Sequence, residues 1–204
     1  MTSNNQLAFA CVCASNVNRS MEGHRVLKEA GFNVSSYGTN DYVKMPGASN
    51  VPLQFDFGAT YKEILSKMES ENNQYYEEQG LIKMLRDDAN TKEKPERWSS
   101  TFNPATLKYF DVIFTYDNNV MDRVLNEFRE NGNRTFQISH VVNIQTPDSR
   151  DNAILSRQYT LRLAQMLSAA TDLTENLESI VDQFNMENGN PKDSFVASFH
   201  IVSY

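Results

Sequence analysis

The sequence contains too few cysteines for a disulfide-stabilised protein. Among its 204 residues there are only two cysteines, Cys11 and Cys13, which lie two positions apart. A framework of long-range disulfides is therefore excluded, and we expect the chain to work in a reducing compartment. A disulfide between such close neighbours would be badly strained, so we expect Cys11 to be a core residue.

The sequence also lacks an excess of positive charge and a long hydrophobic run. Its 19 Lys and Arg residues are outnumbered by 26 Asp and Glu residues, which gives a formal net charge of -7. This sign disfavours direct nucleic-acid binding, which depends on phosphate contacts. No apolar stretch approaches the roughly 20 residues that cross a bilayer, and no signal peptide is recognisable. We therefore expect an intracellular protein that makes no membrane contact.

Histidine is scarce as well. His24, His140 and His200 stand far apart and do not have the spacing of metal ligands, so we expect no metal and no other cofactor. The remaining composition, with 40% hydrophobic residues, 8 Gly and 6 Pro, is typical of a folded protein rather than a disordered one. We expect residues 1–204 to form a single domain and the protein to be a monomer.

Short apolar runs alternate with helical patterns along most of the chain. Strands are expected at 7–12, 32–37, 111–115, 136–144 and 196–204. Helices are expected at 21–30, 119–130, 152–168 and 173–185. This alternation predicts an α/β fold with a mainly parallel central sheet of about five strands flanked by helices. The direction of the last strand stays open.

Residues 39–105 differ in composition from the rest of the chain. The segment holds four of the prolines and many asparagines, and it contains helical patterns near 61–69 and 75–85. We expect a helical and loop insertion that covers the sheet over the active site. Trp98 and the pair Tyr75 and Tyr76 are interpreted as packing residues rather than ligand-binding ones.

The loop after the first predicted strand carries the strongest chemical signal. Cys13 is followed six positions later by Arg19 and then by Ser20, a C-x5-R-S spacing between a strand and a helix. An arc of this length can wrap a tetrahedral oxyanion and point successive backbone N–H groups at it. The sequence therefore predicts a phosphate-binding loop formed by Ala14, Ser15, Asn16, Val17, Asn18, Arg19 and Ser20.

Within this loop, Cys13 and Arg19 are the candidate catalytic residues. The positive field of the loop favours the thiolate form of Cys13, which is the nucleophilic form. Arg19 can present a planar fork to two phosphate oxygens. Asn16 tolerates a left-handed backbone, and Ser20 can donate a hydrogen bond to the thiolate. The alternative is a buried structural cysteine beside a surface arginine.

Displacing an alcohol from phosphorus also requires a proton donor for the leaving oxygen. Asp148 follows the fourth predicted strand, so it should lie at the same sheet edge as the loop, and it is our candidate general acid. Asp151 is the nearest competitor, and Asp117 after the third strand is a weaker one. An ordinary turn aspartate beside Pro147 is the alternative.

The segment from Cys13 to Glu22 resembles the corresponding loop of the low-molecular-weight tyrosine phosphatases. It is still more similar to that of a phosphatase family of the same fold that acts on the C-terminal domain of RNA polymerase II. The further segments that carry this resemblance are Ser36-Tyr37-Gly38-Thr39, Val43-Lys44-Met45-Pro46-Gly47, Gly80-Leu81-Ile82-Lys83-Met84-Leu85, Pro95-Glu96-Arg97 and His140-Val141-Val142-Asn143. The resemblance covers nearly the whole chain.

The resemblance implies an enzyme that removes phosphate from the fifth-position phosphoserine of the heptad repeat, through a phosphocysteine intermediate, when the following proline is cis. It implies Cys13 as nucleophile, Arg19 as phosphate ligand and Asp148 as general acid. It also implies a nuclear location, the phosphorylated polymerase domain as partner, and a symplekin-type scaffold of the mRNA 3′-end cleavage and polyadenylation machinery. The residues implied to line the peptide groove are Lys44, Met45, Pro46, Leu81 and Met84.

The chain departs from the family pattern at two places. Gln145 stands where the family usually has a second aspartate, three residues before the acid, and Arg86-Asp87-Asp88 replaces the usual Asp-Arg-Asn. The first departure could change how the acid is tuned, and the second could change the groove.

Two other functions remain open. One is a phosphotyrosine phosphatase of the same fold, although Ser149 and Arg150 follow Asp148 where such enzymes have aromatic residues. The other is a non-catalytic adaptor of the 3′-end machinery. An arsenate reductase is disfavoured because no cysteine beyond Cys13 is available to relay oxidation.

Overall fold

The computed structural model describes residues 6–131, 136–188 and 195–204. Its centre is a five-stranded sheet in the order β2-β1-β5-β6-β7. The strands are β1 (Ala8–Cys13), β2 (Asn33–Gly38), β5 (Val112–Thr115), β6 (Ile138–Ile144) and β7 (Ala197–Ser203). The first four are parallel, and β7 is an antiparallel edge strand beside β6. The predicted α/β fold with a mainly parallel sheet of about five strands is confirmed.

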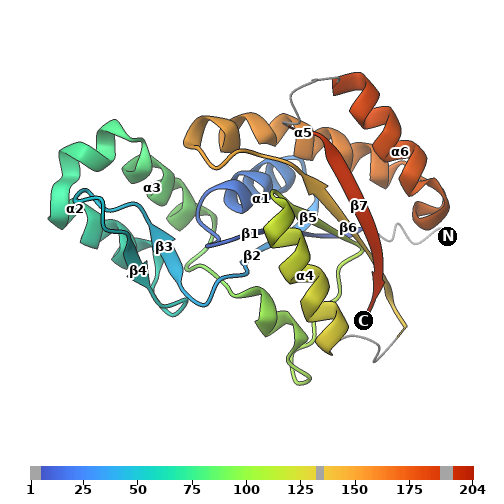
Figure 1. Ribbon diagram of the computed structural model, residues 1–204, viewed down its shortest axis with the longest axis horizontal. Helices are drawn as coiled ribbons and strands as arrows, with labels where there is room; N and C mark the ends of the chain where they lie inside the picture. Colours follow the sequence, from blue (N-terminus) through green and yellow to red (C-terminus); the bar gives the residue numbers. More distant parts are fainter. Residues whose placement is uncertain (1–5, 132–135, 189–194) are drawn as a thin grey trace.

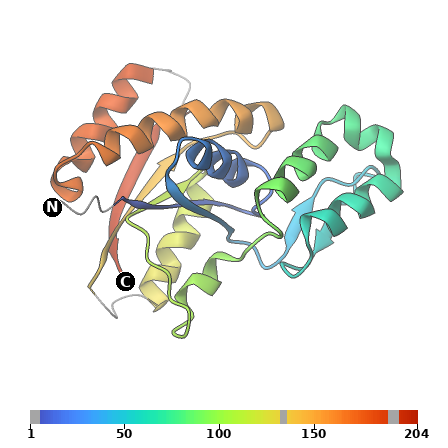
Figure 2. The ribbon, with the colours of Figure 1, turned by 180° about the vertical axis from the view of Figure 1, so that it is seen from behind.

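Helices cover both faces of this sheet (Figures 1 and 2). On one face lie α1 (Arg19–Glu29), α5 (Arg150–Ser168) and α6 (Leu173–Asn188), and on the other lie α4 (Asn118–Asn131) and the 3-10 helix η1 (Trp98–Phe102). Because β1 is buried on both faces, its run is apolar at every position, with Phe9 and Cys11 facing one core and Ala10 and Val12 the other.

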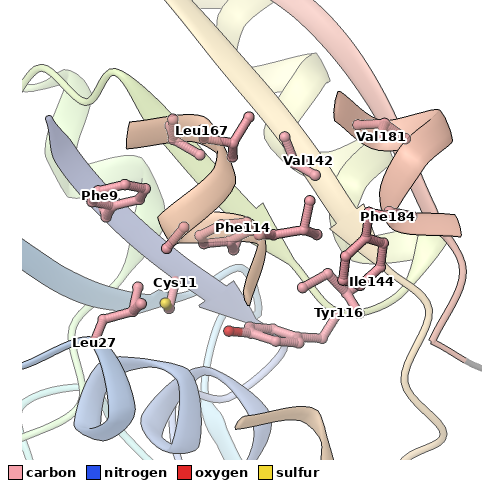
Figure 3. Close-up of a cluster of buried hydrophobic side chains, with 14 of the residues drawn as sticks. Phe9, Cys11, Leu27, Phe114, Tyr116, Val142, Ile144, Leu167, Val181 and Phe184 are labelled. Carbon is pink, nitrogen blue, oxygen red and sulfur yellow. The ribbon is translucent and has the colours of Figure 1, made fainter. Parts of the chain in front are cut away.

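One core lies between a face of the sheet and helices α1, α5 and α6 (Figure 3). Phe9 stacks on Phe114 across neighbouring strands, with ring centroids 5.9 Å apart. The opposite core is rich in aromatic residues, and Trp98 is buried there, as the sequence predicted. These two cores fix the strand ends from which the loops of the site leave.

A separate lobe extends beyond the carboxyl end of β1 (Figure 1). It consists of β3 (Val43–Met45), β4 (Leu53–Phe55), α2 (Tyr61–Glu78) and α3 (Leu81–Thr91). Its core closes on Val17 and Met21 of the loop and α1, so the lobe packs against the loop region rather than over a face of the sheet. The expected position over the loop that carries Cys13 is confirmed by this packing. The expectation that the insertion covers the sheet is wrong for the lobe, because only the later part of the segment, around Trp98 and Phe102, reaches a sheet face.

The lobe differs from the sequence prediction in two further details. The antiparallel pair β3 and β4 was not expected, and each strand has only three residues. The helical pattern predicted at 75–85 is divided by Gly80, whose φ of +70° lies in the left-handed region and separates α2 from α3. The first helix in turn continues to Glu78, past a kink at Asn72. No helix in the described ranges is long and apolar enough to cross a membrane.

Candidate active site

The site is built on the loop between β1 and α1. Cys13 is the last residue of β1 and Arg19 is the first residue of α1, so the C-x5-R-S segment spans the strand-to-helix connection. The pairing of β1 with β2 continues into the loop, because Thr39 N donates to Cys13 O at 3.0 Å and Asn40 N donates to Ala14 O at 2.9 Å. The beginning of the loop is thereby fixed to the sheet.

Asn16 stabilises the middle of the loop from inside the protein. Its φ is +56°, and its side chain is fully buried. Its Oδ1 accepts a hydrogen bond from Glu96 N at 2.9 Å, and its Nδ2 donates to Ser20 Oγ at 3.1 Å. Its carbonyl accepts from the Tyr61 hydroxyl at 2.5 Å. The left-handed turn is therefore tied to the lobe, to residue 96 and to the start of α1.

Gly38 allows the end of β2 to approach this loop closely. A Cβ at Gly38 would lie 2.9 Å from Ala14 O, 3.0 Å from Asn16 N and 2.9 Å from Phe57 Cζ. Two of these atoms belong to the backbone of the loop, which cannot move without changing the loop. Any side chain at this position would therefore displace the loop.

The Cys13 thiol lies at the base of the loop, where it is 4% exposed. Its Sγ is 3.0 Å from Ser20 Oγ. Because Ser20 Oγ already accepts from the Asn16 amide, its own hydrogen is free to point at the sulfur. The geometry therefore provides a hydrogen-bond donor to Cys13.

Arg19 is 4% exposed and is held by groups from two other strand ends. Its Nη1 donates to Asp117 Oδ2 at 3.1 Å, to Thr146 O at 2.9 Å and to Tyr116 O at 3.4 Å. Its Nε lies 3.5 Å from Asp148 Oδ1. These contacts fix the guanidinium plane beside the loop.

The three candidate acids occupy different surroundings. Asp148 is 70% exposed and lines the same cavity as Cys13. Asp117 pairs with Arg19, and its Oδ1 accepts from backbone N–H groups in the first turn of α4, those of Asn119 at 2.9 Å and Val120 at 3.3 Å. Asp151 lies in the first turn of α5. Of the three, Asp148 is the one found in the cavity wall.

The cavity has a volume of about 370 Å³. It gathers Cys13, Arg19 and Asp148 with every residue that was expected to line a groove: Lys44, Met45, Pro46, Leu81 and Met84. Most of the expected phosphate loop also lines it: Ala14, Ser15, Val17 and Asn18. Asn16 and Ser20 instead lie buried behind the loop.

Four further residues that line the cavity were not predicted from the sequence: Tyr75, Gln79, Ser149 and Arg150. Tyr75 was interpreted as a packing residue, and only its neighbour Tyr76 is fully buried. Adjacent tyrosines on a helix point in directions about 100° apart, so one packs inward while the other reaches the cavity. Ser149 and Arg150 directly follow Asp148, and this position in the sequence could have predicted that they line the cavity.

A larger cavity of about 600 Å³ lies between α1, α3 and α5. Its wall is mostly charged, and most of its cations pair with carboxylates, as in the pairs Lys83 with Asp87 and Arg157 with Glu29. It contains neither Cys13 nor Asp148. We therefore place the candidate active site at the smaller cavity.

Cys11, unlike Cys13, does not line the cavity. It is fully buried in the core behind the loop (Figure 3), and burial raises the pKa of its thiol to about 12. Its closest polar neighbour is Tyr116, whose hydroxyl is also hydrogen-bonded to Thr160 at 3.2 Å. Cys11 therefore stays a neutral core residue, as expected.

No group of three or more His, Cys, Asp or Glu side chains in the described parts of the chain is arranged to hold a metal ion. The cavity gathers the Cys13 thiol, the cationic side chains of Arg19, Lys44 and Arg150, and the exposed Asp148 carboxyl around the loop residues. This set is suited to binding an oxyanion and to transferring a phosphoryl group to sulfur.

Comparison with known proteins supports this interpretation. Residues 7–200 match the family model described as Ssu72-like protein. The RNA polymerase II C-terminal domain phosphatase SSU72 of Candida glabrata is 37% identical over 177 residues, which cover 86% of this chain and 84% of that protein. The human SSU72 like protein 2 is 34% identical over 184 residues, covering 90% and 92%.

Solved structures give the same result. The crystal structure of D. melanogaster Ssu72 with Symplekin, bound to a cis peptidomimetic of the polymerase C-terminal domain phosphorylated at the fifth-position serine, has a TM-score of 0.88 and 30% sequence identity to this chain. The alignment covers 98% of this chain and 99% of that one. From its sequence, its fold and the residues gathered around Cys13, the chain belongs to the Ssu72-like family.

Proposed function

We propose that this protein is a cysteine-dependent phosphatase that removes phosphate from the fifth-position phosphoserine of the RNA polymerase II C-terminal-domain heptad repeat. The observation that carries the proposal is the cavity that unites Cys13, Arg19 and Asp148 at the end of a loop suited to phosphate. The activity named for the relatives, and the fifth-position phosphoserine peptide bound to the Drosophila protein, support the choice of substrate.

In the first step, the Cys13 thiolate attacks phosphorus, and an S–P bond forms as the bond from phosphorus to the seryl oxygen breaks. The backbone N–H groups of residues 14–18 and the free N–H groups of Arg19 bind the phosphate oxygens. Asp148 in its acid form donates its proton to the departing seryl oxygen. The products of this step are a dephosphorylated peptide and phosphocysteine.

In the second step, Asp148 as a carboxylate takes a proton from water, and the water oxygen attacks phosphorus. The S–P bond breaks, and inorganic phosphate leaves. The Ser20 hydroxyl, 3.0 Å from Cys13 Sγ, stabilises the thiolate that is released. No metal is required for either step.

Sequence preference must come from the walls, because a phosphate loop by itself selects only charge. Part of the wall comes from β3, from the residue after it and from α3, with Met45, Pro46, Leu81 and Met84 as its apolar residues. A cis X–Pro bond turns a peptide back on itself, so a bent phosphoserine-proline segment can fit a cavity that is too short for an extended chain. We therefore propose selection of the cis isomer.

We propose a nuclear location, because the polymerase domain is the proposed substrate, and a role in mRNA 3′-end processing, as the family resemblance implies. The Drosophila relative is seen with Symplekin, and we propose a symplekin-type scaffold as a partner of this chain too. The formal net charge of -7 is consistent with recruitment by protein rather than by direct nucleic-acid binding.

The proposal is tested with purified protein, p-nitrophenyl phosphate and heptad peptides carrying one phosphoserine each. The Cys13→Ser variant should lose at least about 4 kcal/mol of transition-state stabilisation, roughly a thousandfold in rate, because an alcohol is rarely ionised in such a site. Full activity of Cys13→Ser would contradict the proposal, and so would a wild type without turnover, which would point to an adaptor.

The isomer preference is tested separately, at enzyme concentrations that outpace proline isomerisation. Since roughly 10–30% of X–Pro bonds in free peptides are cis and exchange over tens of seconds, a fast phase should consume that fraction first. Adding a prolyl isomerase should accelerate the slow phase. A single phase that an isomerase leaves unchanged would exclude cis selection and would not affect the phosphatase assignment.

A further inference from the structure

Arg150 has an unusual place at the start of α5. It is the first residue of that helix, where a cation opposes the positive end of the helix dipole. A residue that breaks such a local rule is often held by contacts made elsewhere. The Arg150 side chain is only 18% exposed and reaches from the helix into the wall of the cavity.

Two contacts hold the Arg150 guanidinium. Its Nη2 lies 2.5 Å from Glu22 Oε1, and its Nη1 donates to Asn18 Oδ1 at 3.1 Å. The Asn18 amide in turn donates from Nδ2 to Ser149 O at 3.4 Å. Asn18 belongs to the phosphate loop, and Ser149 follows Asp148. Both ends of the Asn18 amide are therefore joined to the turn that carries Asp148.

Glu22 is the buried end of this chain of contacts. Its side chain is 2% exposed and lies one turn into α1, three residues after Arg19. Its carboxylate meets Arg25 at 2.5 Å and Arg157 at 3.4 Å, in addition to Arg150. Glu22 thus joins the helix that follows the phosphate loop to the helix that follows Asp148.

The three arginines do not depend equally on Glu22. Arg25 also donates a hydrogen bond from Nη1 to Asp88 Oδ1 at 2.5 Å, and Arg157 also pairs with Glu29 at 2.7 Å. Throughout the described ranges, Arg150 has no ion pair other than the one with Glu22. Loss of the Glu22 charge therefore releases Arg150 more than it releases the other two.

Asp148 needs such a support because its own side chain is 70% exposed, with Oδ1 3.5 Å from Arg19 Nε. Packing does not fix an exposed carboxyl, so its position depends on the backbone of the turn. We propose that Arg150, anchored by Glu22, is a positioning residue that sets the place of Asp148 above the phosphate loop. This inference rests on the proposed function, in which Asp148 protonates the seryl oxygen.

The test compares Arg150→Met and Glu22→Gln with the wild type on two substrates. On a phosphoserine peptide, kcat should fall about 10–100-fold with little change in KM, because a misplaced acid fails to protonate a poor leaving group. On p-nitrophenyl phosphate, the loss should be clearly smaller than on the peptide, because nitrophenolate departs with little help. Arg150→Lys keeps the charge but lacks the planar fork whose two nitrogens reach Asn18 and Glu22 separately, and it should be intermediate.

Two controls separate positioning from general damage. Glu29→Gln removes a carboxylate from the same helix and from Arg157, but Glu29 is 62% exposed and does not contact the Asp148 turn. It should leave both rates unchanged. In an Asp148→Asn background, Arg150→Met should add less than about a threefold further loss, because the group it positions is already gone.

Several results would overturn the inference: equal losses on both substrates, a rise in KM alone, or an additive loss in the Asp148→Asn background. Thermal melting identifies a variant that does not fold, and Arg150→Lys then carries the comparison. Failure of the proposed function looks different, because Cys13→Ser would then stay active or the wild type would be inactive.

Discussion

The site geometry predicts that the Asn16 side chain contributes strongly to the stability of the fold. Replacing it with alanine removes the acceptor of Glu96 N and the donor to Ser20 Oγ, and it leaves an ordinary residue at a φ of +56°. Each buried polar group that loses its partner costs about 1–3 kcal/mol, and the left-handed backbone costs alanine about 1 kcal/mol more. We expect Asn16→Ala to lower the free energy of unfolding by about 4 kcal/mol in total.

The chain contains a matched control in Asn50, which has a φ of +62° but is exposed. Asn50→Ala should show only the backbone cost of about 1 kcal/mol. Since a protein of this size shifts by about 2–4 °C per kcal/mol, Tm should fall about 8–16 °C for Asn16→Ala and about 2–4 °C for Asn50→Ala. Thermal unfolding followed by circular dichroism measures both. Equal shifts would show that the Asn16 side-chain bonds contribute nothing, which would refute the argument.

Two further predictions follow from the close approach at Gly38 and from a buried carboxyl. Gly38→Ala should lower turnover by more than about tenfold, because its Cβ would press on Ala14 O of the phosphate loop. A Cβ at Gly58 meets no atom within 4 Å, so Gly58→Ala should leave turnover unchanged in the same assay. Burial raises the pKa of Asp88 to about 8 even beside Arg25, so the folded state keeps a proton that the unfolded state releases above about pH 4. The free energy of unfolding should therefore fall as pH rises from about 4 to 8. Urea titrations at several pH values should show a smaller fall for Asp88→Asn than for the wild type. An equal fall in both proteins would contradict the burial argument.

The phosphate loop could be predicted because its signal is local. Cys13, Arg19 and Ser20 fall within eight consecutive residues, directly after an apolar run that is buried on both sides. The candidate acid required one more step. Carboxyl ends of parallel strands meet at one sheet edge, so Asp148 after β6 was expected near Cys13, and the two line one cavity. The catalytic roles of these residues stay predictions.

Features that depend on distant contacts could not be predicted in the same way. The hairpin of β3 and β4 has three residues in each strand, too few to show a period of two. The contact of Asn16 with Glu96 joins positions that only the folded lobe brings together. The burial of the Arg150 side chain could not be predicted, because an arginine at a helix start is normally exposed. Its partner Glu22 is more than half the chain away in sequence.

The strand order has a consequence for how the protein becomes active. β1 pairs with β5, and nearly half of the chain lies between them, including the lobe whose helices α2 and α3 pack on each other locally. Closing so long a loop costs entropy that local packing does not recover, so the β1–β5 pairing is expected to form after the lobe. Arg19 obtains its contacts with Tyr116, Asp117 and Thr146 only when β5 and β6 are in place. Return of turnover during refolding would therefore report the completion of the sheet, whereas helical signal would return earlier.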